Sequence, residues 1–257
     1  MRLRKEPEAY RWLAEYYDVV FPPNESPMRR VRDTVLKKIM PNVQAACDLA
    51  CGTGETALDF ARAGIETFAV DVSPAMCRLA REKAMRERLS VHVIRADMRR
   101  FRLPQAVDLV TCESDALNHV GTKGDLLSVA RAVARSLRPG GHFLFDVNNA
   151  PGFKKYWTGN VWVEKPGVSV VMRNGHSKNA HRAWSDLEWF IQDGERWVRY
   201  HERVEEVCWS RSEILRAMGQ AGFASLRAWD AAPFFKNPMV TRGCHTIYLA
   251  RRIRLSR

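Results

Sequence analysis

Glycine and aspartate residues between positions 48 and 71 have the types and spacing of a ligand-binding turn. The segment Asp48-Leu-Ala-Cys-Gly-Thr-Gly54 follows a short apolar run and leads into a helical stretch. Glycines between a strand and a helix let a ligand approach the backbone closely. Asp71 ends the next apolar run, 17 residues after Gly54, where a carboxylate can accept both hydroxyls of a ribose. The pattern Gly52-x-Gly54-x-x-Ala57, taken alone, also suits a dinucleotide.

His119 carries a side chain that can transfer a proton. It follows another apolar run, at residues 107–112, within the segment Asp115-Ala-Leu-Asn-His-Val120. An imidazole with an ordinary pKa of about 6.5 can take a proton from an amine or a hydroxyl near neutral pH. The alternative is a histidine whose ring is satisfied by the backbone and serves only the fold.

The sequence around these residues predicts alternating strands and helices, which would position them. Strands that are apolar on both sides and separated by helices predict a parallel sheet with both faces covered. Ligands of such open sheets bind at the carboxyl ends of the strands. The expected strands are residues 45–50, 66–71, 91–95, 107–112 and 142–147, and the expected helices include 74–88 and 123–137.

The pattern changes between residues 151 and 209, which hold six of the eight tryptophans. This segment predicts antiparallel strands without helices, with turns at Gly159-Asn160, Asn174-Gly175 and Asp193-Gly194. A capping box at Ser210–Glu213 then opens a helix, and two strands close the chain. The expected organisation is a helical lid at 1–44, a ligand-binding domain at 45–150 and 210–257, and an antiparallel insertion at 151–209 that covers the site.

Composition restricts the possible partners. The 257 residues include 41 Lys and Arg against 29 Asp and Glu, a net charge of +12. Such a surface attracts acidic partners, but no nucleic-acid motif accompanies it, so we expect only weak, non-specific binding of nucleic acid. No apolar run approaches the ~18 residues of a membrane span, so we expect a cytoplasmic protein with no membrane partner. The six cysteines have no zinc-ligand spacing, and no metal is expected.

The order of these motifs resembles that of the class I S-adenosylmethionine (SAM)-dependent methyltransferases. Asp48-Leu-Ala-Cys-Gly-Thr-Gly54 is similar to their first motif, and Val70-Asp-Val-Ser-Pro-Ala-Met76 to their ribose-binding turn. Ala96-Asp-Met98 is similar to the adenine-contacting turn, and Leu137-Arg-Pro-Gly-Gly141 to the lead into strand five. One departure is Ala50, where the family often has glycine.

The resemblance implies a doubly wound, seven-stranded, mostly parallel α/β sheet whose final strand is antiparallel. It also implies a lid over the cofactor that includes Tyr10 and Tyr17. The residues it assigns to SAM are Tyr17, Asp48, Ala50, Gly52, Gly54, Asp71, Val72, Met76, Asp97, Met98 and Glu113.

Within the family, the chain resembles small bacterial enzymes with an antiparallel insertion after strand five. His119 falls where glycine and nucleotide-sugar N-methyltransferases also carry a histidine. The Asn/Asp-Pro-Pro-Tyr/Phe pattern of enzymes that act on nucleobase amines is missing, as is the Pro-Cys nucleophile of cytosine C5 enzymes. Methylation of DNA bases is therefore not expected.

The expected function is methyl transfer from SAM to a small-molecule nucleophile, with nitrogen slightly favoured over oxygen as the acceptor atom. The sulfonium makes the methyl carbon electrophilic, so the protein mainly positions the reactants and excludes water, which can supply roughly 7–11 kcal/mol. His119 is the expected catalytic residue. Three alternatives stay open: a methyltransferase that uses the basic surface to act on RNA or protein, an NAD-dependent oxidoreductase, and a protein that only binds SAM.

Overall fold

The main layer of the protein is a seven-stranded sheet in the order β10-β11-β5-β4-β1-β2-β3. The computed structural model describes residues 11–22, 27–235 and 240–253. Neighbouring strands from β5 to β3 run parallel, whereas β11 is antiparallel to both β5 and β10. This is the doubly wound topology predicted for the chain. The strands are β1 (Ala45–Leu49), β2 (Glu66–Asp71), β3 (Val91–Arg95), β4 (Val107–Cys112), β5 (Leu137–Asn148), β10 (Phe223–Asp230) and β11 (His245–Arg252).

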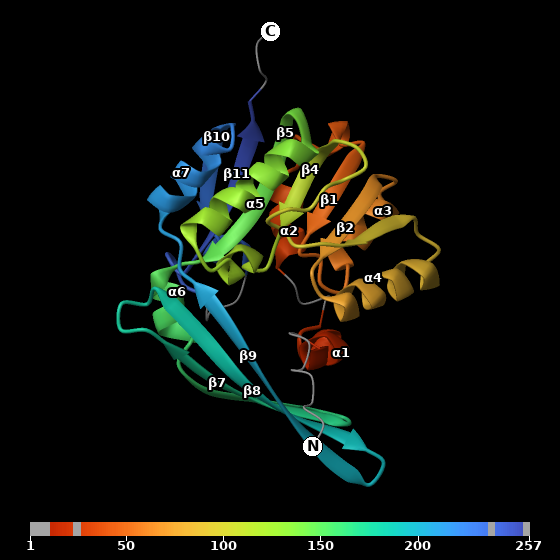
Figure 1. Ribbon diagram of the computed structural model, residues 1–257, viewed down its shortest axis with the longest axis vertical. Helices are drawn as coiled ribbons and strands as arrows, with labels where there is room; N and C mark the ends of the chain where they lie inside the picture. Colours follow the sequence, from red (N-terminus) through yellow and green to blue (C-terminus); the bar gives the residue numbers. More distant parts are fainter. Residues whose placement is uncertain (1–10, 23–26, 236–239, 254–257) are drawn as a thin grey trace.

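Helices cover both faces of this sheet (Figure 1). On one face, α5 and α7 bury Val129 and Ile214 against the side chains of Cys47 and Phe145. On the other, α2 and α3 cover Ala46 and its neighbours. Because both faces of β1 are covered, all five of its residues are buried. These helices are α2 (Met28–Val35), α3 (Glu55–Arg62), α4 (Pro74–Arg86), α5 (Lys123–Ser136), α7 (Arg211–Gln220) and the short α8 (Ala232–Phe235).

A second, four-stranded antiparallel sheet extends below the carboxyl edge of the first sheet in Figure 1, in the order β6-β7-β8-β9. One face packs on α1 (Arg11–Val20), where Tyr16 and Val20 contact a cluster built around Trp189. The insertion thus lies over the edge at which the strands of the main sheet end. Its strands are β6 (Gly159–Lys165), β7 (Val168–His176), β8 (Arg182–Asp193) and β9 (Arg196–Val207).

Two local predictions in the insertion were wrong. Residues 150–156 form a helix, α6 (Ala150–Tyr156), because Pro151 suits a first helical turn and the fully buried Phe153 anchors it. The expected turn at Asn174-Gly175 is instead part of β7. Gly175 is needed there because the Trp184 indole on β8 fills its side-chain position: a Cβ atom would lie 2.6 Å from Trp184 Cε2.

Tyr10, predicted as part of the lid, lies outside the described residues. In the described part of the chain, no helix is long and apolar enough to cross a membrane.

Candidate active site

The glycine turn after β1 has two glycines with different tasks. Both have left-handed backbone conformations, with φ of +52° at Gly52 and +90° at Gly54. A Cβ atom on Gly52 would meet nothing within 4 Å, because this residue faces open space. A Cβ atom on Gly54 would lie 2.9 Å from Ala80 Cβ in α4. Gly52 therefore leaves room for a ligand, whereas Gly54 allows α3 and α4 to pack closely.

Asp71 ends β2 beside that open space. Its carboxylate accepts hydrogen bonds from the backbone N–H groups of Gly52, at 2.9 Å, and of Ser73, at 2.8 Å. Burial raises the pKa of Asp71, and the backbone donors oppose that shift. The two bonds fix the carboxylate at the strand end and leave further lone pairs for a ligand.

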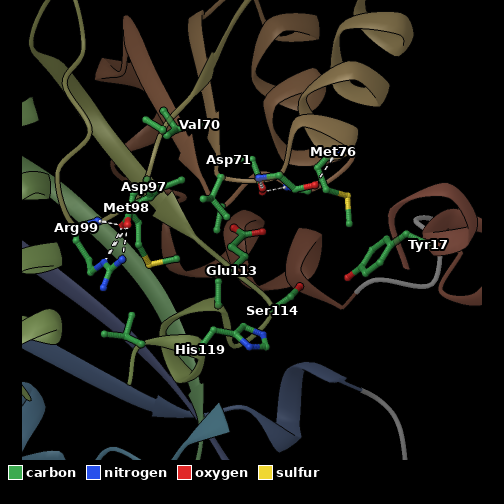
Figure 2. Close-up of a pocket in the computed structure, with 18 of the residues that line it drawn as sticks. Tyr17, Val70, Asp71, Met76, Asp97, Met98, Arg99, Glu113, Ser114 and His119 are labelled. Carbon is green, nitrogen blue, oxygen red and sulfur yellow. Dashed lines mark hydrogen bonds and ion pairs between the residues drawn. The ribbon is translucent and has the colours of Figure 1, made fainter. Parts of the chain in front are cut away.

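A cavity of 380 Å³ lies at the carboxyl edge of the sheet, and we call it the edge cavity. Figure 2 shows Asp71 on one side of it, His119 and Ser114 on the opposite side, and Tyr17 of α1 at one end. Most of the predicted cofactor residues line it: Tyr17, Ala50, Gly52, Asp71, Val72, Met76, Asp97, Met98 and Glu113. Gly54 does not line it, and neither does Asp48.

Asp97 and Met98 follow β3 and form one wall of the edge cavity. Three hydrogen bonds or ion-pair contacts, the shortest at 2.5 Å, hold the Asp97 carboxylate to the Arg99 guanidinium. These hydrogen bonds lower the pKa of Asp97, which keeps this side chain ionised. The side chain is therefore fixed by its own loop, and it still faces the cavity (Figure 2).

Asp48 lies beneath the glycine turn and supports it. Its carboxyl oxygens contact the backbone N–H of Ala57, at 3.2 Å, and the hydroxyl of Thr111, at 3.2 Å. Burial raises its pKa to about 8. Asp48 lines a second cavity of 390 Å³, the loop cavity, which shares Tyr17, Gly52 and Glu113 with the edge cavity.

Glu113 follows β4 and is paired with Arg32, which stands in the basic run Arg29-Arg-Val-Arg32. Arg32 of α2 is buried and donates to Glu113 Oε2 at 2.5 Å and to Asp59 at 2.7 Å. Burial raises the pKa of Glu113 to about 7, against the opposing effect of Arg32. The other carboxyl oxygen, Oε1, is buried without a hydrogen-bond partner. This leaves an acceptor next to both cavities.

Helix α1 is tied to the glycine turn by polar contacts. Thr53 in the turn donates to Asp18 at 2.7 Å, and Lys83 of α4 pairs with Asp18 at 2.5 Å. These contacts hold Tyr17 at the entrance of the edge cavity. Burial, and then the nearby Asp115, raise the pKa of the Tyr17 phenol to about 12, so it stays protonated.

A third cavity, of 530 Å³, lies between the main sheet and the insertion, and we call it the insertion cavity. It shares Tyr17, Ser114 and His119 with the edge cavity. Ser114 and Asp115 both have left-handed backbones, with φ of 58° and 53°, an uncommon conformation that recurs at functional sites. The chain thus turns sharply after β4 and places His119 where the two cavities meet.

His119 is an exposed residue in a short 3₁₀ turn, η3 (Ala116–His119). Its Nδ1 lies 3.1 Å from the backbone oxygen of Glu205 in β9. The surrounding protein lowers its pKa, which favours the neutral imidazole. Among the described residues, Asp115, His119 and Glu206 place one possible metal-ligand atom each within 4.8 Å of one another.

Comparison with known proteins agrees with this architecture. Residues 46–141 match the family described as a methyltransferase domain. A dTDP-3-amino-3,6-dideoxy-alpha-D-glucopyranose N,N-dimethyltransferase of Streptomyces fradiae is 23% identical over 221 residues, which are 82% of this chain and 84% of the relative.

Two solved structures share the fold over nearly the whole chain. An S-adenosylmethionine-dependent methyltransferase of Clostridium acetobutylicum is 23% identical, covering 95% of this chain and 99% of its own, with a TM-score of 0.79. The sugar N-methyltransferase KedS8 of Streptoalloteichus is 20% identical, covering 99% and 97%, with a TM-score of 0.78.

The methyltransferase-domain match, the shared fold and the site together support a class I SAM-dependent methyltransferase. The chain adds a four-stranded antiparallel sheet after β5. The nicotinamide-dependent alternative and the RNA- or protein-directed alternative are not favoured by these findings.

The residues at the edge cavity suit SAM. Gly52 leaves open space, Asp71 offers carboxylate oxygens to a ribose, and the unpartnered Oε1 of Glu113 offers a negative group to a cation. The contact of each residue with SAM stays a prediction.

Several residues of the site have no recognisable sequence signal. Arg32 looks like part of a basic surface run, and Asp146, Asn148, Glu206 and His245 stand in strands with no motif around them. Only the fold brings the last four to the insertion cavity.

Proposed function

We propose that the protein transfers the methyl group of SAM to a nitrogen atom of a small molecule bound in the insertion cavity. The observation that carries this proposal is the junction of the edge and insertion cavities at Tyr17, Ser114 and His119. A cofactor in one cavity and an acceptor in the other would meet there. The cover formed by the insertion and α1 suits a small acceptor better than a folded RNA or protein.

Nitrogen is favoured over oxygen on two grounds. A relative is named as an N,N-dimethyltransferase of a dTDP-linked amino sugar, and a structural neighbour as a sugar N-methyltransferase. In addition, an amine is a good nucleophile as soon as its ammonium form has lost the proton that it carries at neutral pH. An alcohol would need a stronger base than the groups at this junction supply.

When bound, SAM would supply a sulfonium-bound methyl group: the amine lone pair would form the new N–CH₃ bond while the S–CH₃ bond breaks, so the neutral thioether would leave and the amine would become a methylated ammonium. Neutral His119 can take the proton that the entering ammonium must lose first. The contact between Nδ1 and the Glu205 carbonyl makes Nδ1 the protonated nitrogen of the neutral ring, so Nε2 is the basic nitrogen. Tyr17 and Ser114 line the same junction and would limit access of water.

Acceptor pairs that share a skeleton test this proposal. The protein is incubated with methyl-labelled SAM and either glucosamine or glucose, and either benzylamine or benzyl alcohol. We expect labelled N-methyl product from the amines only. Transfer to the alcohols in preference, or to bulk RNA in preference to every small molecule, would refute it.

A further inference from the structure

A group of buried polar side chains at the floor of the insertion cavity has no task in the chemistry described so far. It consists of Asp115, Asp146, Asn148, Glu206 and His245, which come from four segments and all line the cavity. Asp146 is fully buried and accepts from His245 Nε2, at 2.6 Å, and from the Asp115 backbone N–H, at 2.8 Å. Asn148 donates to the carboxylates of Asp115 and Glu206.

The hydrogen bonds within this group leave some of the buried polar atoms around the cavity without a partner. Asp146 Oδ1 is buried and has no hydrogen-bond partner, and the same holds for Ser185 Oγ on the facing strand β8. Both residues are at least nine-tenths buried, and both line the insertion cavity. Buried polar atoms normally have a partner, so two unpartnered atoms in one cavity point to a polar ligand.

The charges of the cavity wall define the sign of that ligand. Three carboxyl groups, Asp115, Asp146 and Glu206, line the cavity, and none of its described lining residues is a lysine or an arginine. Burial lowers the pKa of His245, but its hydrogen bond to Asp146 outweighs this effect and raises it, so the imidazolium offsets the charge of Asp146 and leaves Asp115 and Glu206 without a cation among the residues that the structure describes. The rest of the wall is largely apolar and includes Trp157, Met172 and Leu187. Such a wall suits a ligand that joins a cationic group to an apolar skeleton, and its carboxylates would repel a phosphate.

We propose that Asp115 and Glu206 bind the ammonium group of the acceptor, and that the acceptor carries no phosphate in this cavity. The proposal rests on the proposed function and narrows its substrate class to cationic amines. It separates this protein from the relative named for a dTDP-linked sugar, whose diphosphate would need cationic partners. The reacting nitrogen would lie between these carboxylates and His119, with which they form a compact group.

The protonation of the two carboxyls agrees with this assignment. Burial, and then the neighbouring Asp146, raise the pKa of Asp115 to about 7, and burial raises that of Glu206 well above its ordinary value. Asp115 faces Asp146 of β5, Glu206 of β9, His245 of β11 and Tyr17 of α1. A bound cation favours the ionised forms of both carboxyl groups. Amine binding should therefore weaken as the pH falls below about 7, because Asp115 then takes up a proton.

The test is a titration of the full chain, saturated with S-adenosylhomocysteine, followed by ligand-observed NMR. The probes are benzylamine, benzyl alcohol, benzyl phosphate and thymidine diphosphate. We expect the wild-type protein to bind benzylamine at least 10-fold more tightly than any of the others, because hydrogen bonds to ionised groups are the strong ones. Equal or tighter binding of either phosphate would overturn the proposal without using a variant.

Two variants, Asp115→Asn and Glu206→Gln, locate the site. Each should weaken benzylamine binding about 10-fold or more and leave benzyl alcohol and S-adenosylhomocysteine binding unchanged. Asp186→Asn is the matched control, because Asp186 lies on the outer face of the same sheet, paired with Arg203. Unchanged benzylamine binding in folded variants, or an equal loss for the alcohol, would overturn the assignment.

The outcomes also separate this proposal from the proposed function. If amines are methylated but the two variants bind them normally, only the ammonium site is wrong. If alcohols are methylated in preference to amines, the proposed function itself fails. Zinc chloride titrated alone is a further probe: zinc binding that both variants abolish, with no binding of benzylamine, would make the cluster a metal site and overturn the proposal.

Discussion

Valine substitutions at Gly52 and Gly54 should separate ligand binding from packing within one turn. Each forces a branched residue into a left-handed conformation, which costs about 1–2 kcal/mol of folding free energy. At Gly52 little is added to this cost, because the new side chain meets open space. At Gly54 the new Cβ lies 2.9 Å from Ala80 Cβ, and overpacking adds about 1–3 kcal/mol.

Gly54→Val should lose more stability than Gly52→Val, whereas Gly52→Val should lose more affinity for the cofactor. Gly54→Val should lose about 2–5 kcal/mol of unfolding free energy in urea denaturation, whereas Gly52→Val should lose about 1–2 kcal/mol. Calorimetry should show at least a 100-fold loss of SAM affinity in Gly52→Val, which is about 2.7 kcal/mol, because the valine would occupy the cofactor's space. A folded Gly52→Val protein with normal SAM affinity would refute the assignment of the turn as the cofactor cradle.

Four further outcomes follow from the site. Asp71→Ala should weaken SAM binding roughly 10- to 150-fold by calorimetry, since the ribose loses a charged acceptor; unchanged affinity would contradict the assignment. His119→Ala should lower kcat by about 10²-fold or more with nearly unchanged SAM affinity. In the wild type, kcat at saturating acceptor should rise with pH through the imidazole pKa, which lies below its usual 6.5, because the neutral form is the base. His119→Asn should lose this dependence of kcat on pH, and a full rate in His119→Asn would make His119 a positioning residue.

Arg32→Gln should lower the unfolding free energy in urea denaturation by about 3–5 kcal/mol, because it leaves the buried Glu113 without its cation. The control Arg29→Gln, at an exposed position, should change the unfolding free energy by less than about 0.5 kcal/mol. Similar losses in both variants would contradict this account. RNA binding, measured by filter retention, should be weak and should disappear as salt is raised; nanomolar binding of one defined RNA at physiological salt would contradict it.

The sequence predicted the main sheet because its signals are local. Each strand is a short apolar run, and each turn carries glycine, aspartate or a capping serine that acts on its own neighbours. The edge cavity follows from the same motifs, since the carboxyl ends of parallel strands meet at one edge. For this reason most of the predicted cofactor residues line one cavity.

The parts that were missed depend on contacts between distant segments. Arg32 looks like a surface residue until α2 packs beside β4 and pairs it with Glu113, 81 residues away. Gly175 looks like a turn until the indole of Trp184 is placed over it. Glu206 and His245 are 39 residues apart in the chain, and only the arrangement of the insertion on the main sheet brings both to the insertion cavity.

A crystal structure with sinefungin, a SAM analogue that carries an amine in place of the methyl-bearing sulfonium, tests the central claim most directly. We expect its ribose on Asp71 and its adenine beside Met98. Its added amine should point past Ser114 and His119 into the insertion cavity. An analogue bound with that amine facing bulk solvent, or bound outside the edge cavity, would contradict the account.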